Sequence, residues 1–251
     1  MSPIAISAII FVSVFGGALA GIALRAILPE HHLSSESKDV VKLSMGLVAT
    51  MSALVLGLLV ASAKSSYDTQ GTEVTDLSAR IILLDRMLAH YGPESQPIRA
   101  QLKVVATAMA DHLDPPAHGP GESLSAPTTR GELPYELLKE LTPKNEDQRA
   151  LKEQILRMML DLGKERWLMF EQGIGSFEPI LVILVVTWLT LIFASFGLYA
   201  KPNGTVTVAL AIAAFSVSTA MFLILEMYQP YNGLIHVSIA PLRAALAHLG
   251  L

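Results

Sequence analysis

The chain has 251 residues, of which 52% are hydrophobic and only 16% are charged, and its formal net charge at pH 7 is −4. A soluble domain carries about 25% charged residues, so this composition is typical of a membrane protein, and the negative charge gives no support for a nucleic-acid partner. The chain contains no cysteine, which excludes disulfides, thiol catalysis and thiolate metal sites.

Four apolar stretches, separated by a charged middle segment, set the expected fold. They are residues 4–28, 41–63, 177–199 and 205–226. Each approaches or exceeds the roughly 20 apolar residues that cross a bilayer as a helix. The pattern predicts an all-α integral membrane protein with four transmembrane helices and a helical soluble domain inserted between spans two and three. The expected parts are a first transmembrane helix pair (1–63), the soluble domain (64–176), a second pair (177–228) and a C-terminal amphipathic tail (229–251).

The first span begins directly after three residues that carry no basic side chain, so we expect it to be retained and not cleaved as a signal peptide. Gly17 and Gly21 within it form a small-xxx-small pair, which predicts the close approach of another helix. The loop that follows contains His31 and His32. Adjacent histidines point to different sides of a helix or strand, so no metal site is expected there.

The second span is the most strongly patterned part of the chain. Small residues recur along it every three or four positions, at Gly46, Ala49, Ala53, Gly57 and Ala61. These positions share one stripe of a helix, and a stripe of small residues predicts a close helix–helix contact. We call it the small-residue stripe.

A second face of the same span is apolar in the middle and carries hydroxyl groups at both ends. Its candidate pore-lining residues are Ser44, Met51, Val55 and Ser62. This face either meets lipid and other helices or lines a narrow apolar pore in an oligomer, where the pore gates by dewetting. In the opposite register the small-residue stripe faces the axis and Met51 meets a neighbouring helix.

The charged middle segment reads as a small antiparallel helical bundle. No helix breaker follows the second span until the Gly92-Pro93 pair, so we expect that helix to continue out of the membrane to about residue 91. Further helices are expected at 96–113, 134–141 and 145–172. Residues 114–134 are rich in Pro, Gly, Ser and Thr, so we expect a flexible loop there.

Two carboxylates mark the domain side of the second transmembrane pair. Glu178 precedes the third span and Glu226 ends the fourth, so both are expected at a membrane interface, where a carboxylate is costly unless it is hydrated or paired. They either pair with a basic residue such as Lys64 or Arg243, or belong to an ion pathway. The tail beyond residue 239 has helical apolar spacing and either lies flat on the membrane or packs under the bundle.

No Walker loop, dinucleotide fingerprint, HExxH or EF-hand loop is present, and the histidines are scattered. The sequence therefore predicts no catalytic residues, no cofactor and no metal, and the chain is not expected to be an enzyme. Four spans place both termini and the middle domain on the same side of the membrane. The basic residues near the span ends are equally numerous on the two sides, so charge does not assign the orientation.

Three runs of residues resemble the bacterial bestrophin-like family. They are LGLLVASAKSSY at 56–67, ARIILLDRMLAHYGPE at 79–94, and FLILEMYQPYNGLI at 222–235, the last continuing to Pro241-Leu242. The resemblance covers nearly the whole chain. The name of the family implies a distant similarity to bestrophins. Bestrophins are homopentameric anion channels whose second membrane helix lines the pore and continues into a helical cytosolic region.

The resemblance implies a homo-oligomeric ion channel of the bacterial inner membrane, with the second span around the axis and the termini and middle domain in the cytoplasm. Its partners would be the lipid bilayer and further copies of the chain, and the permeating ion stays open. Bestrophins bind calcium through an acidic cluster after the last span and have aromatic rings in the pore. Here the tail offers only Glu226 and the second span has no aromatic residue, so calcium gating and anion selectivity are not expected to carry over. The alternative is a non-conducting membrane scaffold or sensor whose helical domain binds a partner.

Overall fold

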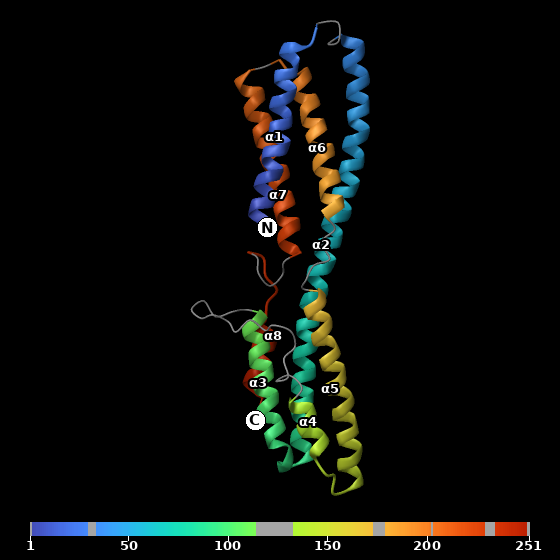
Figure 1. The fold of residues 1–251 in the computed structure, drawn as a ribbon, viewed down its shortest axis with the longest axis vertical. Helices are drawn as coiled ribbons and strands as arrows, with labels where there is room; N and C mark the ends of the chain where they lie inside the picture. The colour runs from blue at the N-terminus through green and yellow to red at the C-terminus, as the bar shows by residue number, and fades with distance from the viewer. Residues whose placement is uncertain are drawn as a thin grey trace. The chain divides into compact units, whose positions relative to one another are not determined.

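The computed structural model describes residues 2–29, 34–113, 133–172, 179–201, 203–228 and 234–249. Every regular element in these ranges is a helix (Figure 1), which confirms the all-α expectation. The elements are α1 (Pro3–Ile27), α2 (Ser35–Tyr91), the 3-10 turn η2 (Pro93–Ser95), α3 (Gln96–Leu113), α4 (Leu133–Glu140), α5 (Glu146–Gln172), α6 (Pro179–Tyr199), α7 (Gly204–Met227) and α8 (Ala240–His248).

The chain divides into two compact units. The first, here called the span unit, consists of Met1–Ser66, Phe177–Gln229 and Gly233–Ile235. The second, here called the bundle unit, consists of Tyr67–Ser176, Pro230–Asn232 and His236–Leu251. The single helix α2 contributes to both, and its 57 residues run without a break, as the sequence predicted.

Four helices among the described residues are long and apolar enough to cross a membrane, namely α1, α2, α6 and α7. Local sequence signals set where two of them begin. The Ser2 side chain accepts a hydrogen bond from the Ala5 amide, and Pro3 follows at the first helical position. The Asn203 side chain accepts a hydrogen bond from the Val206 amide at 2.7 Å, which caps the start of α7.

Glycines bring α1 and α6 into close contact, which confirms the prediction for the Gly17–Gly21 pair. A Cβ atom added to Gly21 would overlap the carbonyl oxygen of Ala194 on α6, and one added to Gly17 would lie 2.8 Å from the Thr190 side chain. Gly197 does the same from the other side, since its Cβ would overlap the carbonyl oxygen of Ala18. We call these three glycines the glycine seam.

An apolar cluster fills the interior of the span unit and draws on all four of its helices. Its buried members include Val14 and Ala18 of α1, Val185 of α6, Met221 of α7 and Ala63 of α2. Buried hydroxyl groups inside the unit are paired. Ser218 of α7 donates a hydrogen bond to the carbonyl of Ser7 on α1 at 2.6 Å, and Ser7 donates to the carbonyl of Pro3 at 2.8 Å. Such pairing is needed where no water is present to take its place.

The bundle unit has two clusters of buried apolar residues. One joins α2, α3, α4 and α5 through residues such as Leu88, Leu102, Leu138 and Ile155. The other joins α2 and α3 with the C-terminal segment, in which Leu242 is fully buried. The tail therefore packs in the bundle, which decides between the two alternatives that its sequence left open.

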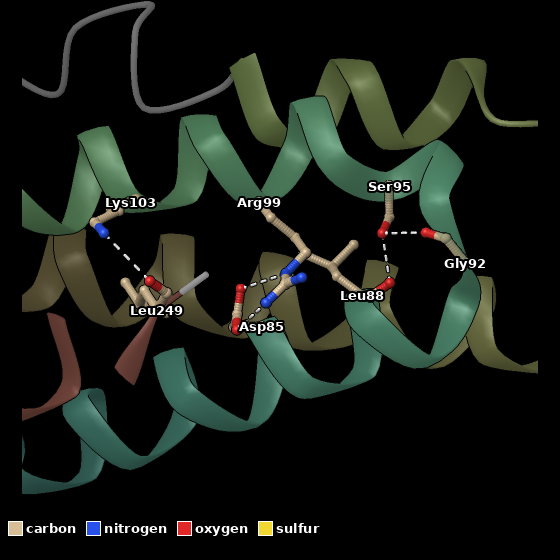
Figure 2. Close-up of polar contacts among 7 residues, drawn as sticks. All are labelled: Asp85, Leu88, Gly92, Ser95, Arg99, Lys103 and Leu249. Atoms are coloured by element: carbon tan, nitrogen blue, oxygen red, sulfur yellow. Dashed lines mark hydrogen bonds and ion pairs between the residues drawn. The ribbon is translucent and has the colours of Figure 1, made fainter. Parts of the chain in front are cut away.

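Polar contacts fix the corner between α2 and α3 (Figure 2). Gly92, which follows α2, has φ of 129°, a conformation that glycine adopts without strain. The Ser95 hydroxyl donates to the carbonyls of Leu88 at 2.5 Å and Gly92 at 2.8 Å. Since the last carbonyls of a helix have no partner within it, Ser95 stabilises the end of α2.

A bidentate ion pair lies inside this corner. Arg99 of α3 donates from Nε and Nη2 to the two carboxylate oxygens of Asp85 on α2, each at 2.8 Å (Figure 2). The side chains are 14% and 3% exposed. The hydrogen bonds that Arg99 donates to Asp85 raise the pKa of Arg99. One turn further along α3, Lys103 donates to the carbonyl of Leu249 at 3.2 Å, which ties the chain after α8 to the bundle.

Three of the expected features lie outside the described residues. They are Glu178, the His31-His32 pair, and most of the loop expected at 114–134. The last two residues of that loop, Leu133 and Pro134, begin α4 instead. Pro134 suits this place because the amide hydrogen that proline lacks would have no partner in the first helical turn.

Candidate functional site

The membrane-spanning part of α2 is the least covered of the four apolar helices. Only 11% of its most apolar window is buried inside the chain, against 28% to 33% for the corresponding windows of α1, α6 and α7. This part, residues 41–63, therefore leaves most of its surface uncovered by the rest of the chain.

One narrow face of this helix packs against the rest of the span unit. Ser52, Leu59 and Ala63 are buried, at 3%, 3% and 0% exposure. Val55 and Leu56 are partly buried and pack against the interior cluster. Ser52 satisfies its hydroxyl within the helix by donating to the Val48 carbonyl at 2.8 Å. We call this the inner face of α2.

The small-residue stripe lies away from the inner face, and all five of its residues are exposed. A Cβ atom built on Gly46 or on Gly57 would have nothing within 4 Å. In the glycine seam, by contrast, added Cβ atoms collide with another helix. Within the described chain the stripe makes no close contact of the predicted kind, so a partner for it would have to come from another molecule.

The predicted pore-lining residues do not share one environment. Ser44, Met51 and Ser62 are exposed, and the Ser44 hydroxyl donates to the Val40 carbonyl at 2.9 Å. Val55 instead packs against the interior cluster. Three of the four therefore lie at one edge of the exposed surface, and the fourth lies on the inner face.

Helix geometry identifies the face that points directly away from the subunit. Successive residues advance by about 100° around a helix of 3.6 residues per turn. Counted from Leu59, the residues roughly opposite are Thr50, Leu54, Gly57 and Ala61, and Leu54 is 70% exposed. We call this the outer face of α2. Sequence reasoning missed Thr50 and Leu54, because the apolar pattern alone does not say which side the other helices of the subunit cover.

Comparison with protein families decides which kind of protein this is. A family model described as Bestrophin-like domain matches residues 12–242. The chain belongs to the bestrophin-like family. The match includes most of α1 and all of α2 to α7, so the resemblance read from the three runs is confirmed, and this bestrophin-like chain is a multi-pass membrane protein. No curated protein and no solved structure matched the chain.

In this bestrophin-like protein the carboxylate at the end of the fourth span has a structural contact. Glu226 is 3% exposed, and its Oε2 accepts a hydrogen bond from the Leu234 amide at 2.5 Å. The carboxylate therefore ties the end of α7 to the chain that follows it. Its predicted counterpart Glu178 lies outside the described residues, so the two are not compared.

The described residues contain no cluster of three or more histidine, aspartate or glutamate side chains that could hold a metal ion. The bundle unit has an apolar cavity of about 50 Å³, lined by residues such as Leu102, Met109, Tyr135 and Met159. This cavity is smaller than an engineered apolar cavity of about 150 Å³ that binds benzene.

Proposed function

We propose that this protein is a homo-oligomeric ion channel in which the membrane-spanning part of α2 surrounds the central axis. In this proposal it lies in the bacterial inner membrane, and the bundle unit, as a domain inserted between spans two and three, faces the cytoplasm together with both termini. The observation that carries the proposal is the outward exposure of α2, the helix that lines the pore in bestrophins. No residue is assigned a catalytic role.

The bare glycines on α2 support self-association. Helices in a bilayer associate through van der Waals packing where small residues let the backbones approach. Gly46 and Gly57 leave open space of this kind on α2. At the glycine seam, by contrast, the facing helix of the same chain already occupies the space. Most homo-oligomers close into rings about a symmetry axis. A ring in which α2 of each copy contacts α2 of the next would fill that space.

The position of the inner face favours one of the two registers. In a ring of α2 helices, the inner face packs against the rest of its own subunit and therefore points away from the axis. The outer face then points toward the axis. The axis would then be lined by Thr50, Leu54, Gly57 and Ala61. Met51 and Ala53 lie on the two flanks and would face neighbouring copies. This is the register in which part of the small-residue stripe approaches the axis. The partly buried position of Val55 on the inner face argues against the other register.

Leu54 is then the best candidate for an apolar constriction. A ring of leucine side chains presents a barrier to a hydrated ion, because water is not retained between apolar walls. Thr50 lies one turn away and carries a hydroxyl that donates to the Gly46 carbonyl at 3.0 Å. It would provide a wetter position next to the constriction.

Ion flux from purified protein in liposomes tests the proposal. Leu54→Ser should hydrate the constriction and raise flux. Leu191→Ser is the matched control, because Leu191 is similarly exposed, at 52%, but lies on α6. An increase for Met51→Ser, with none for Leu54→Ser, would support the register of Ser44, Met51, Val55 and Ser62 instead.

The scaffold or sensor alternative has its own signature. If the parent protein gives no flux above empty liposomes under any applied ion gradient, and its mass in detergent is that of one chain, the channel proposal is wrong. Orientation is tested by labelling single cysteines in this cysteine-free chain. Cysteines at the exposed positions Lys201 and Glu153 should react from opposite sides of the membrane.

A further inference from the structure

Four buried oxygen atoms in the bundle unit have no hydrogen-bond partner among the described residues: Tyr91 Oη, Glu94 Oε2, Gln70 Oε1 and Glu73 Oε2. The last two lie on α2 just beyond its membrane-spanning part. Gln70 as a whole is 8% exposed. Buried polar atoms are rarely left unpaired, because they lose their hydrogen bonds to water without gaining others. Each unpaired atom therefore needs an explanation.

Gln70 and Glu73 lie three residues apart on the same helix. Residues three apart on a helix are neighbours on its surface, with Cβ atoms about 5–6 Å apart. Glutamine and glutamate side chains are long enough to meet across that distance. A carbonyl oxygen and an ionised carboxylate oxygen are both acceptors, so they cannot pair as they stand. One proton on the carboxyl group would turn it into a donor and satisfy both atoms.

We propose that Glu73 carries a proton in the folded protein and donates it in a hydrogen bond to Oε1 of Gln70. The pair is then a pH-sensitive contact on α2 inside the bundle unit. At low pH the contact is intact. When Glu73 loses its proton, two buried acceptors face each other and the contact becomes repulsive.

The surroundings of Glu73 act in the same direction. Burial raises the pKa of its carboxyl group, and the negative charge of Glu165 on α5 raises it further. Arg80, seven residues further along α2, forms an ion pair with that same Glu165 at 3.0 Å. The positive charge of Arg80 is therefore engaged by Glu165.

The other charged groups near this level of the bundle come from three helices. They are Asp68 and Asp76 on α2, Asp161 and Lys164 on α5, and Arg243 on α8. Asp68, Asp76, Asp161 and Lys164 are exposed. Water screens their charges, so they affect a buried carboxyl group less than burial itself does.

The direction of the pH effect follows from proton linkage. If the pKa of Glu73 is higher in the folded than in the unfolded chain, the folded state binds more protons between the two values. Stability is then fully present below the unfolded pKa and is lost as the pH rises through the folded pKa. The effect belongs to the bundle unit and stands whether or not the protein conducts ions.

Infrared spectroscopy and thermal unfolding of the full chain in detergent test the proposal. The parent protein should show the carbonyl-stretch band of a protonated carboxyl group that titrates above the range of exposed glutamates. Glu73→Gln should lack this band, and Asp76→Asn, which removes an exposed carboxylate three residues away, should keep it. Within the titration window, the unfolding equilibrium of the parent should change about tenfold per pH unit relative to Glu73→Gln.

A second variant reads out the hydrogen bond itself. Gln70→Met removes the acceptor and puts an apolar side chain of similar length in its place. Loss of a partner that favours the protonated form should shift the infrared titration midpoint to lower pH. An upward shift would mean that the Gln70 amide donates to an ionised Glu73, and an unchanged midpoint would mean no contact. Either of these results, or a titrating band that persists in Glu73→Gln, overturns the proposal.

Discussion

The glycine seam between α1 and α6 gives the sharpest stability prediction. A Cβ atom on Gly21 would overlap the carbonyl oxygen of Ala194 and lie 2.9 Å from both the Ala194 carbonyl carbon and the Leu198 amide nitrogen. All three are backbone atoms, which a rotamer change cannot move. Because the overlap with the Ala194 carbonyl oxygen is the tightest of these contacts and carbon atoms pack best at about 3.5–4.0 Å, Gly21→Ala requires the two helices to separate by about 1 Å or more.

Separation of the helices weakens the contacts along the whole seam. Overpacking a well-packed interior costs about 1–3 kcal/mol, and the rigid backbone on both sides places Gly21→Ala near the upper end. For a chain of this size, each 1 kcal/mol lowers the melting temperature by about 2–4 °C. We therefore expect the melting temperature in detergent to fall by about 4–10 °C. Gly197→Ala should have a similar effect, because its Cβ would overlap the Ala18 carbonyl oxygen.

Gly16 supplies the matched control. It lies on the same helix, in the same apolar segment, and a Cβ built on it has nothing within 4 Å. Gly16→Ala should leave the melting temperature unchanged or raise it slightly, since alanine favours a helix over glycine by about 1 kcal/mol. Equal melting temperatures for Gly16→Ala and Gly21→Ala would refute the close approach of α1 and α6.

Two further predictions concern the bundle and the assembly. Arg99→Met should destabilise the bundle by about 3–5 kcal/mol, because it leaves the carboxylate of Asp85 buried without its partner. A loss of unfolding free energy below about 1 kcal/mol in chemical denaturation would contradict a buried pair. Gly57→Leu should reduce the mass of the particle in detergent, because a large side chain at the axis forces the α2 helices of the copies apart. It should not collide within its own chain, where the space around Gly57 is open, so an unchanged mass would argue against the close approach of the small-residue stripe to the axis.

The candidate site could be predicted only in part. The repeat of small residues identified α2 as a contact helix, and the apolar pattern identified its candidate faces. The choice between faces needed the inner face, which Ser52 and Leu59 define by packing against other helices. The face opposite Leu59, with Thr50 and Leu54, could not be found without it. Helical periodicity relates residues to one another around an axis, but gives no direction in space.

The sequence by itself determined the helices, and the tertiary structure decided what each of them contacts. Helix length, apolar content and end signals such as Ser2 and Asn203 act within a few residues, so they can be read from the chain. The partner of Gly21 on α6, the pairing of Asp85 with Arg99, and the docking of the C-terminal segment through Leu242 each join parts of the chain that lie apart in sequence. Such contacts depend on which apolar faces can be buried together, and that is settled only when all the helices pack.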